Sequence, residues 1–298
     1  QASTLDFRKI PGNPIAYWVS DKFRAGFEKG TLLGEISRAR RGLETGDNER
    51  FIRRWFEISS KNFARHIHER NDLTDDDKWI PYNKGGDARK WSNHTLICVN
   101  WSEGGELIRR NGGVLNGSDV YFRTGITWGG LTSSTVTFRL SPSGHIFDSN
   151  KGAMMFPKAS DLNVTLGFLN SSLVQLSLSL LNPTLSTQNG DIDRLSLYTD
   201  HLAKKAVSGT VEEAVAIARA DWDSFEISWD FKTFPILDLR SAIDKTPTDS
   251  VEECWNRWNE LTVERISRMQ GLETENNRLF IDAYGLQDEL SPEVPLDQ

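Results

Sequence analysis

Two glycines, short polar side chains and one arginine meet in residues 42–51, which read GLETGDNERF. The glycines permit positive φ and close backbone approach, while the small polar side chains can bond to nearby backbone or to a ligand. Further arginines precede and follow the stretch, and such cations suit a polyanion. A capped helix start beside a solvated charge run explains the same residues equally well. The candidate nucleic-acid contacts here are Thr45, Asn48, Arg50 and Arg53.

A second basic stretch, residues 78–91, interleaves cations with aromatic residues in the order KWIPYNKGGDARKW. Lys84, Arg89 and Lys90 surround two glycines, whose backbone amides can approach a phosphate because no Cβ stands in the way. We therefore expect these three cations to clamp a DNA backbone. The aromatic residues are expected to anchor the loop in the core, since duplex recognition does not require stacking. They are Trp79, Tyr82 and Trp91.

Side chains suited to reading bases lie on predicted strands and turns between residues 120 and 141. Arginine pairs with guanine O6 and N7, and serine or threonine hydroxyls bond to either kind of base edge. Alternation along a strand directs every second side chain outward, where it can face a DNA groove. The candidates are Arg123, Thr127, Ser133, Ser134 and Arg139.

Other chemistry lacks its usual signatures. The chain has no Gly-x-x-x-x-Gly-Lys-Ser/Thr loop, no His-Glu-x-x-His pair and no Gly-x-Ser-x-Gly elbow. His66 and His68 lack a nameable third ligand, so a solvated polar face is favoured over a metal site. Gly129 and Gly130 favour a hairpin turn over a phosphate cradle, because no lysine or helix signal follows them. We therefore expect no metal and no catalytic residue in this chain.

Composition and charge fit a globular piece of a cytoplasmic protein. With 298 residues and 38% hydrophobic content the chain can bury a core. No apolar run reaches the ~18 residues of a membrane span, and no leader pattern opens the sequence, so no membrane contact is expected. Cys98 and Cys254 are expected to be reduced thiols. The net charge of −7 is concentrated after residue 248, where twelve acids face four bases, so the rest is near neutral and can present a basic face.

Apolar spacing and turn signals predict an α+β chain with a mixed sheet, followed by a helical C-terminal segment. Ser20 is expected to cap a helix over residues 21–41. Predicted strands cover residues 95–101, 120–127, 135–140 and 144–148.

Three helices are predicted in the second half. A leucine-rich buried helix is expected over residues 162–181, ended by Pro183. Thr210 with Glu213 forms a capping-box pattern and predicts a helix start. A long amphipathic helix is expected from Ser250 to about Asp282, as a spacer, a docking strut or an ordinary packing helix.

The residue patterns of these stretches resemble those of a known family. Residues 42–51 closely resemble the "G-[LI]-x-T-G-x-N-x-x-F" signature that opens the target-recognition domain of gamma-class adenine-N6 DNA methyltransferases. Residues 78–91 are similar to a block of the PglX family, the methyltransferases of BREX phage-defence systems. Further similar blocks follow in the same order, so that the resemblance spans most of the chain. They are residues 123–128, 166–171, 181–184 and 277–286.

The resemblance implies a division of labour. Residues 1–41 would connect to an absent methyltransferase domain, residues 42–205 would form the target-recognition domain, and residues 206–298 a helical spacer. Residues 13–18, NPIAYW, depart from the family's catalytic Asn-Pro-Pro-Tyr/Phe motif. The site for S-adenosylmethionine is therefore expected in the parent protein and not here, and the chain alone is expected to be inactive. The implied partners are double-stranded DNA and the parent methyltransferase domain.

A different class of function stays open at this level. The tryptophans and phenylalanines and the acidic amphipathic helix suit a protein-interaction module. Such a module would dock other defence components or a phage protein that mimics DNA. Restriction cleavage is a weaker third reading, since related enzymes place nuclease motifs elsewhere in the chain.

Overall fold

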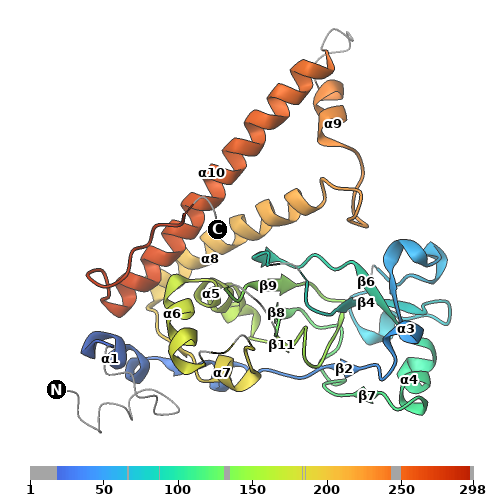
Figure 1. The fold of residues 1–298 in the computed structure, drawn as a ribbon, viewed down its shortest axis with the longest axis horizontal. Coiled ribbons are helices and arrows are strands. Elements are labelled where there is room, and N and C mark those ends of the chain that lie inside the picture. The colour runs from blue at the N-terminus through green and yellow to red at the C-terminus, as the bar shows by residue number, and fades with distance from the viewer. Residues whose placement is uncertain are drawn as a thin grey trace.

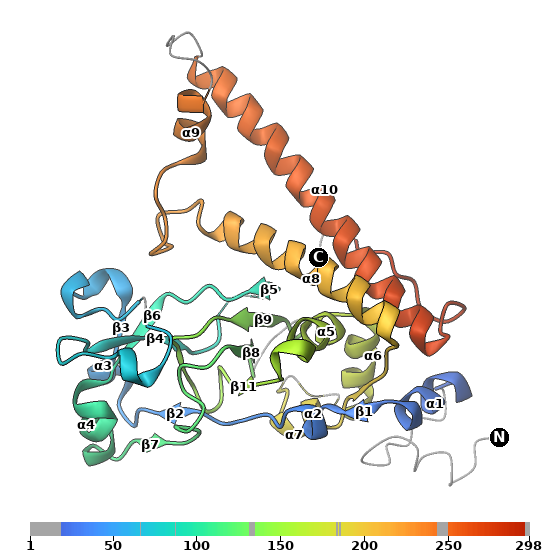
Figure 2. The ribbon, with the colours of Figure 1, turned by 180° about the vertical axis from the view of Figure 1, so that it is seen from behind.

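Helices and mixed sheets share the fold, which confirms the predicted α+β class (Figure 1). The computed structural model describes residues 19–65, 67–86, 88–130, 135–182, 184, 186–242 and 250–295. Seen from either side, a broad body carries a long helix that projects away from it (Figure 2).

Among the described residues, the strands of the body form two four-stranded and two two-stranded sheets. One large sheet has the order β10-β4-β6-β3 and the other β11-β8-β9-β5, each with one parallel pair at an edge. The small sheets are β1-β12 and β2-β7. The strands are β1 Thr31–Leu32, β2 Leu43–Glu44, β3 Ile52–Arg54, β4 Trp79–Asn83, β5 Trp91–Ser92, β6 Ile97–Asn100, β7 Val114–Leu115, β8 Gly125–Trp128, β9 Phe138–Ser141, β10 Ile146–Phe147, β11 Met154–Met155 and β12 Ser196–Leu197.

Helices flank these sheets and dominate the second half of the chain. They are α1 Asp21–Lys29, α2 Leu33–Ile36, α3 Asn48–Phe51, α4 Glu106–Arg110, α5 Ala159–Leu169, α6 Ser172–Leu181, α7 Asn189–Asp193, α8 His201–Trp222, α9 Pro235–Ala242 and α10 Val251–Tyr284. Short 3-10 turns lie at Trp55–Glu57, Ser60–Asn62, Arg70–Asp72 and Ser102–Gly105.

Two hydrophobic cores hold the body together. The first joins the β11-β8-β9-β5 sheet to α5, α6, α8 and the C-terminal half of α10, with Trp128, Phe168 and Phe280 fully buried. The second lies around the β10-β4-β6-β3 sheet and includes Phe51 and Phe147. Because α8 and α10 share the first core with a sheet, the helical segment packs directly on the strands. The predicted domain boundary at residue 206 falls inside α8.

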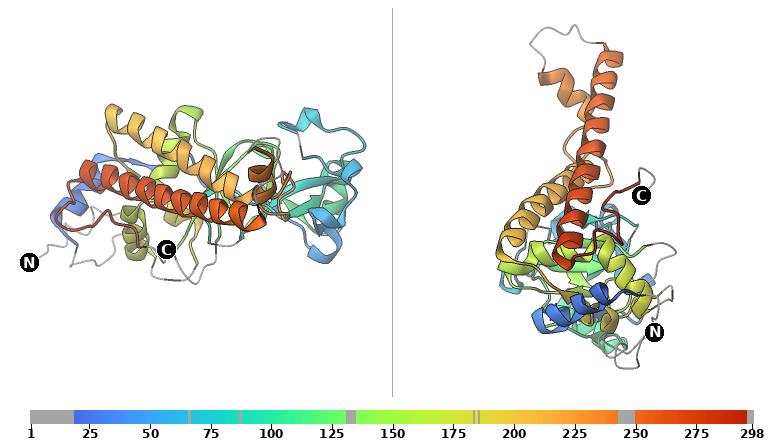
Figure 3. Two further views of the ribbon diagram at one scale, coloured as in Figure 1. Left: turned by 90° about the horizontal axis from the view of Figure 1, so that it is seen from above. Right: turned by 90° about the vertical axis from the view of Figure 1, so that its left-hand side faces the viewer.

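The long amphipathic helix is confirmed, and it runs unbroken through Gly271. Ser250 and Glu253 cap its start reciprocally, and Gly285 ends it with a φ of 69°. Its 34 residues span about 50 Å, so the N-terminal half extends beyond the body and meets α9 near its tip (Figure 3).

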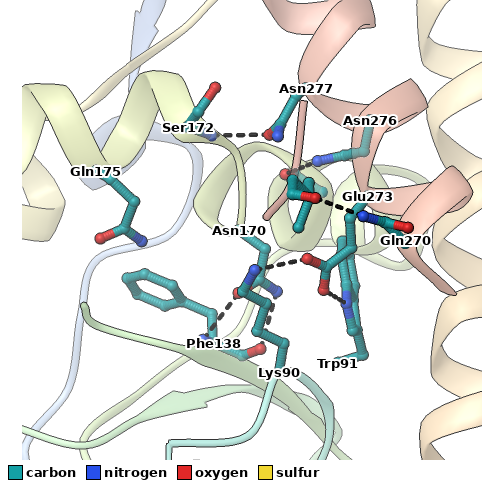
Figure 4. A network of polar contacts seen from close by, with 12 residues as sticks. Lys90, Trp91, Phe138, Asn170, Ser172, Gln175, Gln270, Glu273, Asn276 and Asn277 are labelled. Carbon is teal, nitrogen blue, oxygen red and sulfur yellow. Dashed lines mark hydrogen bonds and ion pairs between the residues drawn. The ribbon is translucent and has the colours of Figure 1, made fainter. Parts of the chain in front are cut away.

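Buried amides fasten the other half of α10 to the body (Figure 4). The Asn276 side chain donates to the Gly167 carbonyl at 2.9 Å, and the Ser172 amide donates to Asn277 at 2.8 Å. Both asparagines are buried, so each of these hydrogen bonds replaces one that the same groups make with water in the unfolded chain.

The structure corrects two helix predictions, those over residues 21–41 and 162–181. The predicted cap is confirmed, since the Ser20 side chain accepts from the Phe23 amide, but α1 ends at Lys29 where strand β1 begins. The single helix predicted over residues 162–181 is wrong: α5 and α6 meet at 73°. The Asn170 side chain bonds to both backbone groups of Phe138 on β9, and Ser171 caps α6, so the chain turns there. Pro183 lies outside the described residues.

The predicted helix start at Thr210 is also wrong. Asp200 caps α8 instead, and the Thr210 hydroxyl donates to the Ala206 carbonyl one turn earlier inside the helix. Among the helices of the described residues, none alone has the length and apolar composition of a membrane span. The bent pair α5 and α6 reaches that composition only when both are taken together.

Candidate nucleic-acid interface

The first predicted contacts lie on the chain around strand β2, along one edge of the body. Strand β2 pairs antiparallel with β7, so the chain around residues 40–50 runs beside residues 111–119. The close approach expected of Gly42 is present: a Cβ there would lie 1.9 Å from the Phe147 carbonyl oxygen. Gly46 has the expected positive φ of 71°. Both glycines therefore shape the path of this edge.

The loop after β2 is the capped helix start that its sequence indicated. The Asp47 side chain accepts from the Arg50 amide at 3.0 Å and begins α3. The Thr45 hydroxyl donates to Asn48 Oδ1 at 2.7 Å, and Thr45 is only 3% exposed. Thr45 therefore holds the loop in shape and does not present its hydroxyl outward, whereas Asn48 is exposed.

Arginines follow this loop at the surface. Arg50 is exposed and donates to Asn111 Oδ1 at 2.6 Å, which joins the loop to the end of α4. Arg53 is half-buried and donates to the Glu49 carbonyl at 2.5 Å. Arg54 is exposed, with its guanidinium 5.8 Å from the centre of the Phe56 ring.

More arginines gather at the other end of the edge, around the turn at residues 116–123. Arg40 pairs with Asp119 at 2.6 Å, and that hydrogen bond holds the pKa of Asp119 below its ordinary value. Arg70 donates to the Ser118 carbonyl at 3.1 Å. Arg123 is exposed beside the Phe156 ring, on the rim of a hollow of about 530 Å³.

We call this surface the basic edge. Within the part of the chain that the structure describes, the guanidinium groups of six of its arginines have no carboxylate oxygen within 4.0 Å. Several of them contact neutral acceptors or aromatic rings, so none of the six is held in an ion pair among the described residues. The basic edge comprises Arg40, which is paired, and Arg41, Arg50, Arg53, Arg54, Arg70 and Arg123, which are not.

The second predicted site, residues 84–91, has a different environment, and we call it the paired segment. Lys84 pairs with Asp148 at 2.6 Å, Arg89 with Asp221 at 3.1 Å, and Lys90 with Glu273 at 2.7 Å. In this conformation each of the three positive charges has a carboxylate partner, and the predicted contact of these cations with a DNA backbone stays a prediction.

The same segment is anchored through its aromatic residues, as predicted for Tyr82 and Trp91, which are buried. Glu273 also accepts from Trp91 Nε1 at 2.6 Å, so one carboxylate on α10 holds two neighbouring residues (Figure 4). Trp91 has a φ of 74°, a conformation that a bulky side chain adopts only when its surroundings impose it. The paired segment is thus a joint between the sheets and the C-terminal helices.

Burial and bonding compete at Asp148. Desolvation on its own raises the pKa of this carboxyl, but the amides of Lys151 and Asn150 and the Lys84 ammonium outweigh it, and the pKa falls below 3.8. The Tyr82 hydroxyl donates to the same carboxylate at 2.9 Å. The charged Asp148 carboxylate therefore accepts hydrogen bonds from several groups beside the paired segment.

Two predicted base-reading residues lie in the interior. Thr127 and Arg139 are each only 1% exposed, because their strands β8 and β9 are covered on both faces. The Thr127 hydroxyl donates to the Ala153 carbonyl at 3.2 Å, and Arg139 Nη2 donates to the Gly85 carbonyl at 3.4 Å. The expected outward direction is wrong for both. Ser133 and Ser134 lie outside the described residues.

The remaining residues of possible chemical interest have structural partners. His68 bonds to Ser143, and no group of three metal-ligating side chains occurs among the described residues, which do not include His66. Cys98 and Cys254 are free thiols and buried. Arg70 belongs to the basic edge although it was not among the predicted contacts. No local signal in the sequence marks it, since only the fold brings it to Ser118.

The comparisons with known proteins agree with the resemblance seen in the sequence. No protein-family profile matches the chain. It is 37% identical over 300 aligned residues to an adenine-specific methyltransferase, PglX, of Lacticaseibacillus casei strain Zhang, and 35% identical over 245 residues to one called BrxX of Escherichia coli O9:H4 strain HS. These matches cover 97% and 80% of this chain but only 24% and 19% of the relatives. Along most of its length, the chain is therefore related to a segment of the PglX and BrxX adenine-specific methyltransferases. That segment makes up about a quarter or less of the length of each relative.

Proposed function

We propose that this region recognises the DNA target of an adenine-N6 methyltransferase, with the basic edge as the surface that meets the duplex. The observation that carries the proposal is the row of six arginines without carboxylate partners, on a chain related to adenine-specific methyltransferases. Guanidinium groups without an ion-pair partner are suited both to phosphates and to guanine edges.

Arginines lie at both ends of the β2-β7 pair. Arg50 bonds to the end of α4, while Arg40 and Arg70 bond to Asp119 and Ser118 in the turn after β7. Arg123, beside the hollow, is our choice for a base contact, and Arg50 and Arg53 for phosphate contacts.

The chemistry of methyl transfer is assigned to another part of the protein. The cavity of about 640 Å³ does not fit a site for S-adenosylmethionine, because both carboxylates that line it are already bound, Asp221 by Arg89 and Glu273 by Lys90. No acidic side chain is left there to hold ribose hydroxyls. By the same relationship, we propose that the whole protein uses S-adenosylmethionine and marks host DNA within a BREX phage-defence system.

Mapping of methylated adenines tests this role in cells that carry the complete methyltransferase. Arg123→Ala should relax the methylated motif at one base position, since a lost guanine contact costs about 1–3 kcal/mol. Arg109→Ala is the matched control, because Arg109 is exposed but already paired with Glu106 at 2.9 Å. An unaltered motif with methylation reduced at every site alike would assign Arg123 to backbone contact. Unchanged methylation in variants of Arg50, Arg53 and Arg123 together would overturn the proposal.

A further inference from the structure

The hollow of about 530 Å³ beside Arg123 is built from parts of the chain that are far apart in sequence. Buried Phe122 and Pro157 share its lining with exposed Arg123 and Glu69. A concave site with a few polar groups among apolar ones is the usual form of a binding site. The contributing segments are residues 68–69, 121–124, 143 and 157–162.

The backbone before Arg123 has an unusual conformation that presents this arginine at the hollow. Phe122 is 2% exposed and has a φ of 69°, which a bulky residue adopts only when its surroundings impose it. Its amide donates to the His145 carbonyl, and its carbonyl accepts from the Gly144 amide, both at 2.9 Å. The chain thus keeps Phe122 in the core and turns Arg123 to the surface. Such conformations cluster at binding sites.

Glu69 brings a negative charge to the same hollow. Glu69 and Asp72 cap the turn Arg70–Asp72 reciprocally, and His68 Nδ1 bonds to Ser143 Oγ at 2.9 Å, so this side of the hollow is held in place. Among the described residues, no cationic nitrogen lies within 4.0 Å of the Glu69 carboxylate. A carboxylate has about four acceptor sites, so Glu69 can still accept from a ligand.

Two opposite charges on one hollow argue against a phosphate as its occupant. Arg123 would attract a phosphate, but Glu69 would repel it. A neutral ligand that presents both acceptors and a donor suits the pair better. The edge of a base pair in the major groove of DNA presents both kinds of group.

The pattern of donors and acceptors selects one kind of base pair. Guanine presents two neighbouring acceptors, O6 and N7, which match the fork of an arginine, and its partner cytosine presents an amino donor. In an A·T pair, a donor separates the two acceptors, so the fork loses one bond. We propose that the hollow reads one G·C pair, with Arg123 on guanine and Glu69 on the cytosine amino group. Reading of this pair rests on the proposed DNA-recognition role.

Duplexes with single altered bases test this with the complete methyltransferase and its mapped motif. The analogue 7-deazaguanine lacks N7, and deoxyzebularine lacks the cytosine amino group. We expect one G·C pair of the motif at which each analogue weakens binding at least about fivefold. The same replacements outside the motif should stay within about twofold and serve as the control. A motif without a G·C pair, or without one that responds to both analogues, would overturn the proposal.

Two variants assign each half of the pair to its residue. Glu69→Ala should abolish the effect of deoxyzebularine at this pair and keep that of 7-deazaguanine, because only the amino contact is lost. Arg123→Ala should do the reverse. Glu226→Ala is the matched control, since Glu226 is exposed on the turn after α8 and has no ion pair among the described residues. It should keep both effects.

Persistence of the deoxyzebularine effect in Glu69→Ala would overturn the role of Glu69. The analogues act on the parent protein, so a variant that fails to fold leaves the first test intact. The two proposals can also fail separately. A motif altered by Arg123→Ala, together with a Glu69→Ala variant that keeps both analogue effects, would retain DNA recognition and remove the assignment of the G·C pair.

Discussion

The basic edge and the paired segment are both rich in cations and glycines, yet the fold uses them in opposite ways. In the basic edge, six arginines lack a carboxylate partner among the described residues. In the paired segment, Lys84, Arg89 and Lys90 each have one. A cation without an ion-pair partner can bind a ligand without giving up an existing contact. The partners of the paired segment lie far along the sequence, at Asp148, Asp221 and Glu273, so no local pattern reveals them.

The largest effect is expected in the paired segment. Glu273→Ala leaves the Lys90 ammonium and Trp91 Nε1 without their shared acceptor in a largely buried site. The free energy of unfolding should fall by about 3 kcal/mol, measured by chemical denaturation. Glu275→Ala is the control. Its pair with Arg278 is exposed and should contribute at most about 1 kcal/mol. Equal losses in both variants would mean that the segment is not a structural joint.

A backbone change should have the next largest effect, on the basic edge. Gly42→Ala would place a Cβ 1.9 Å from the Phe147 carbonyl oxygen, so the chain must shift. We expect a loss of about 2–3 kcal/mol in unfolding free energy. Gly129→Ala is the control, since a Cβ there meets nothing within 4 Å, and it should change stability by less than about 0.5 kcal/mol. Similar stability of the two variants would show that the edge tolerates displacement at residue 42.

Duplex binding compares the two regions directly. Changing Arg50, Arg53 and Arg123 together to alanine should lower affinity about tenfold or more. It should also flatten the dependence of log K on log salt by about 0.9 for each lost phosphate contact. Arg89→Ala should change neither quantity, because its charge is already paired with Asp221. The reverse result, a flatter slope only for Arg89→Ala, would transfer DNA contact to the paired segment. Gel shift or fluorescence anisotropy at several salt concentrations measures both.

The smallest effect concerns the stability of the fold at acidic pH. The folded-state pKa of Asp148 lies below its ordinary value of 3.8, so its contribution to stability is present above that value and is lost as the pH falls through the lower pKa. Asp148→Asn should cost about 1 kcal/mol at pH 7. The difference in unfolding free energy between parent and variant should then shrink below pH 4. A constant difference from pH 7 to pH 2 would contradict a charged Asp148.

Local signals predicted those elements whose ends and faces depend on nearby residues. The caps at Ser20 and Ser250, the length of α10 and the burial of Tyr82 and Trp91 were correct, as was the α+β class. Hydrophobic spacing and side-chain capping act within a few residues, so the sequence carries them directly. The resemblance to adenine-specific methyltransferases was likewise legible, because it consists of ordered blocks of residues.

Contacts between distant residues decided the rest. The side chain of Asn170 bonds to β9 and bends a helix that its leucines alone would continue, and Asp200 caps α8 ahead of Thr210. Strand alternation alone would turn every second side chain of β8 and β9 outward. Other parts of the fold cover both faces of these strands, so Thr127 and Arg139 are buried. The positions of the cations along the chain follow from the residue order. Which of these cations remain unpaired follows from the fold, because ion pairing depends on distances in space between residues far apart along the chain.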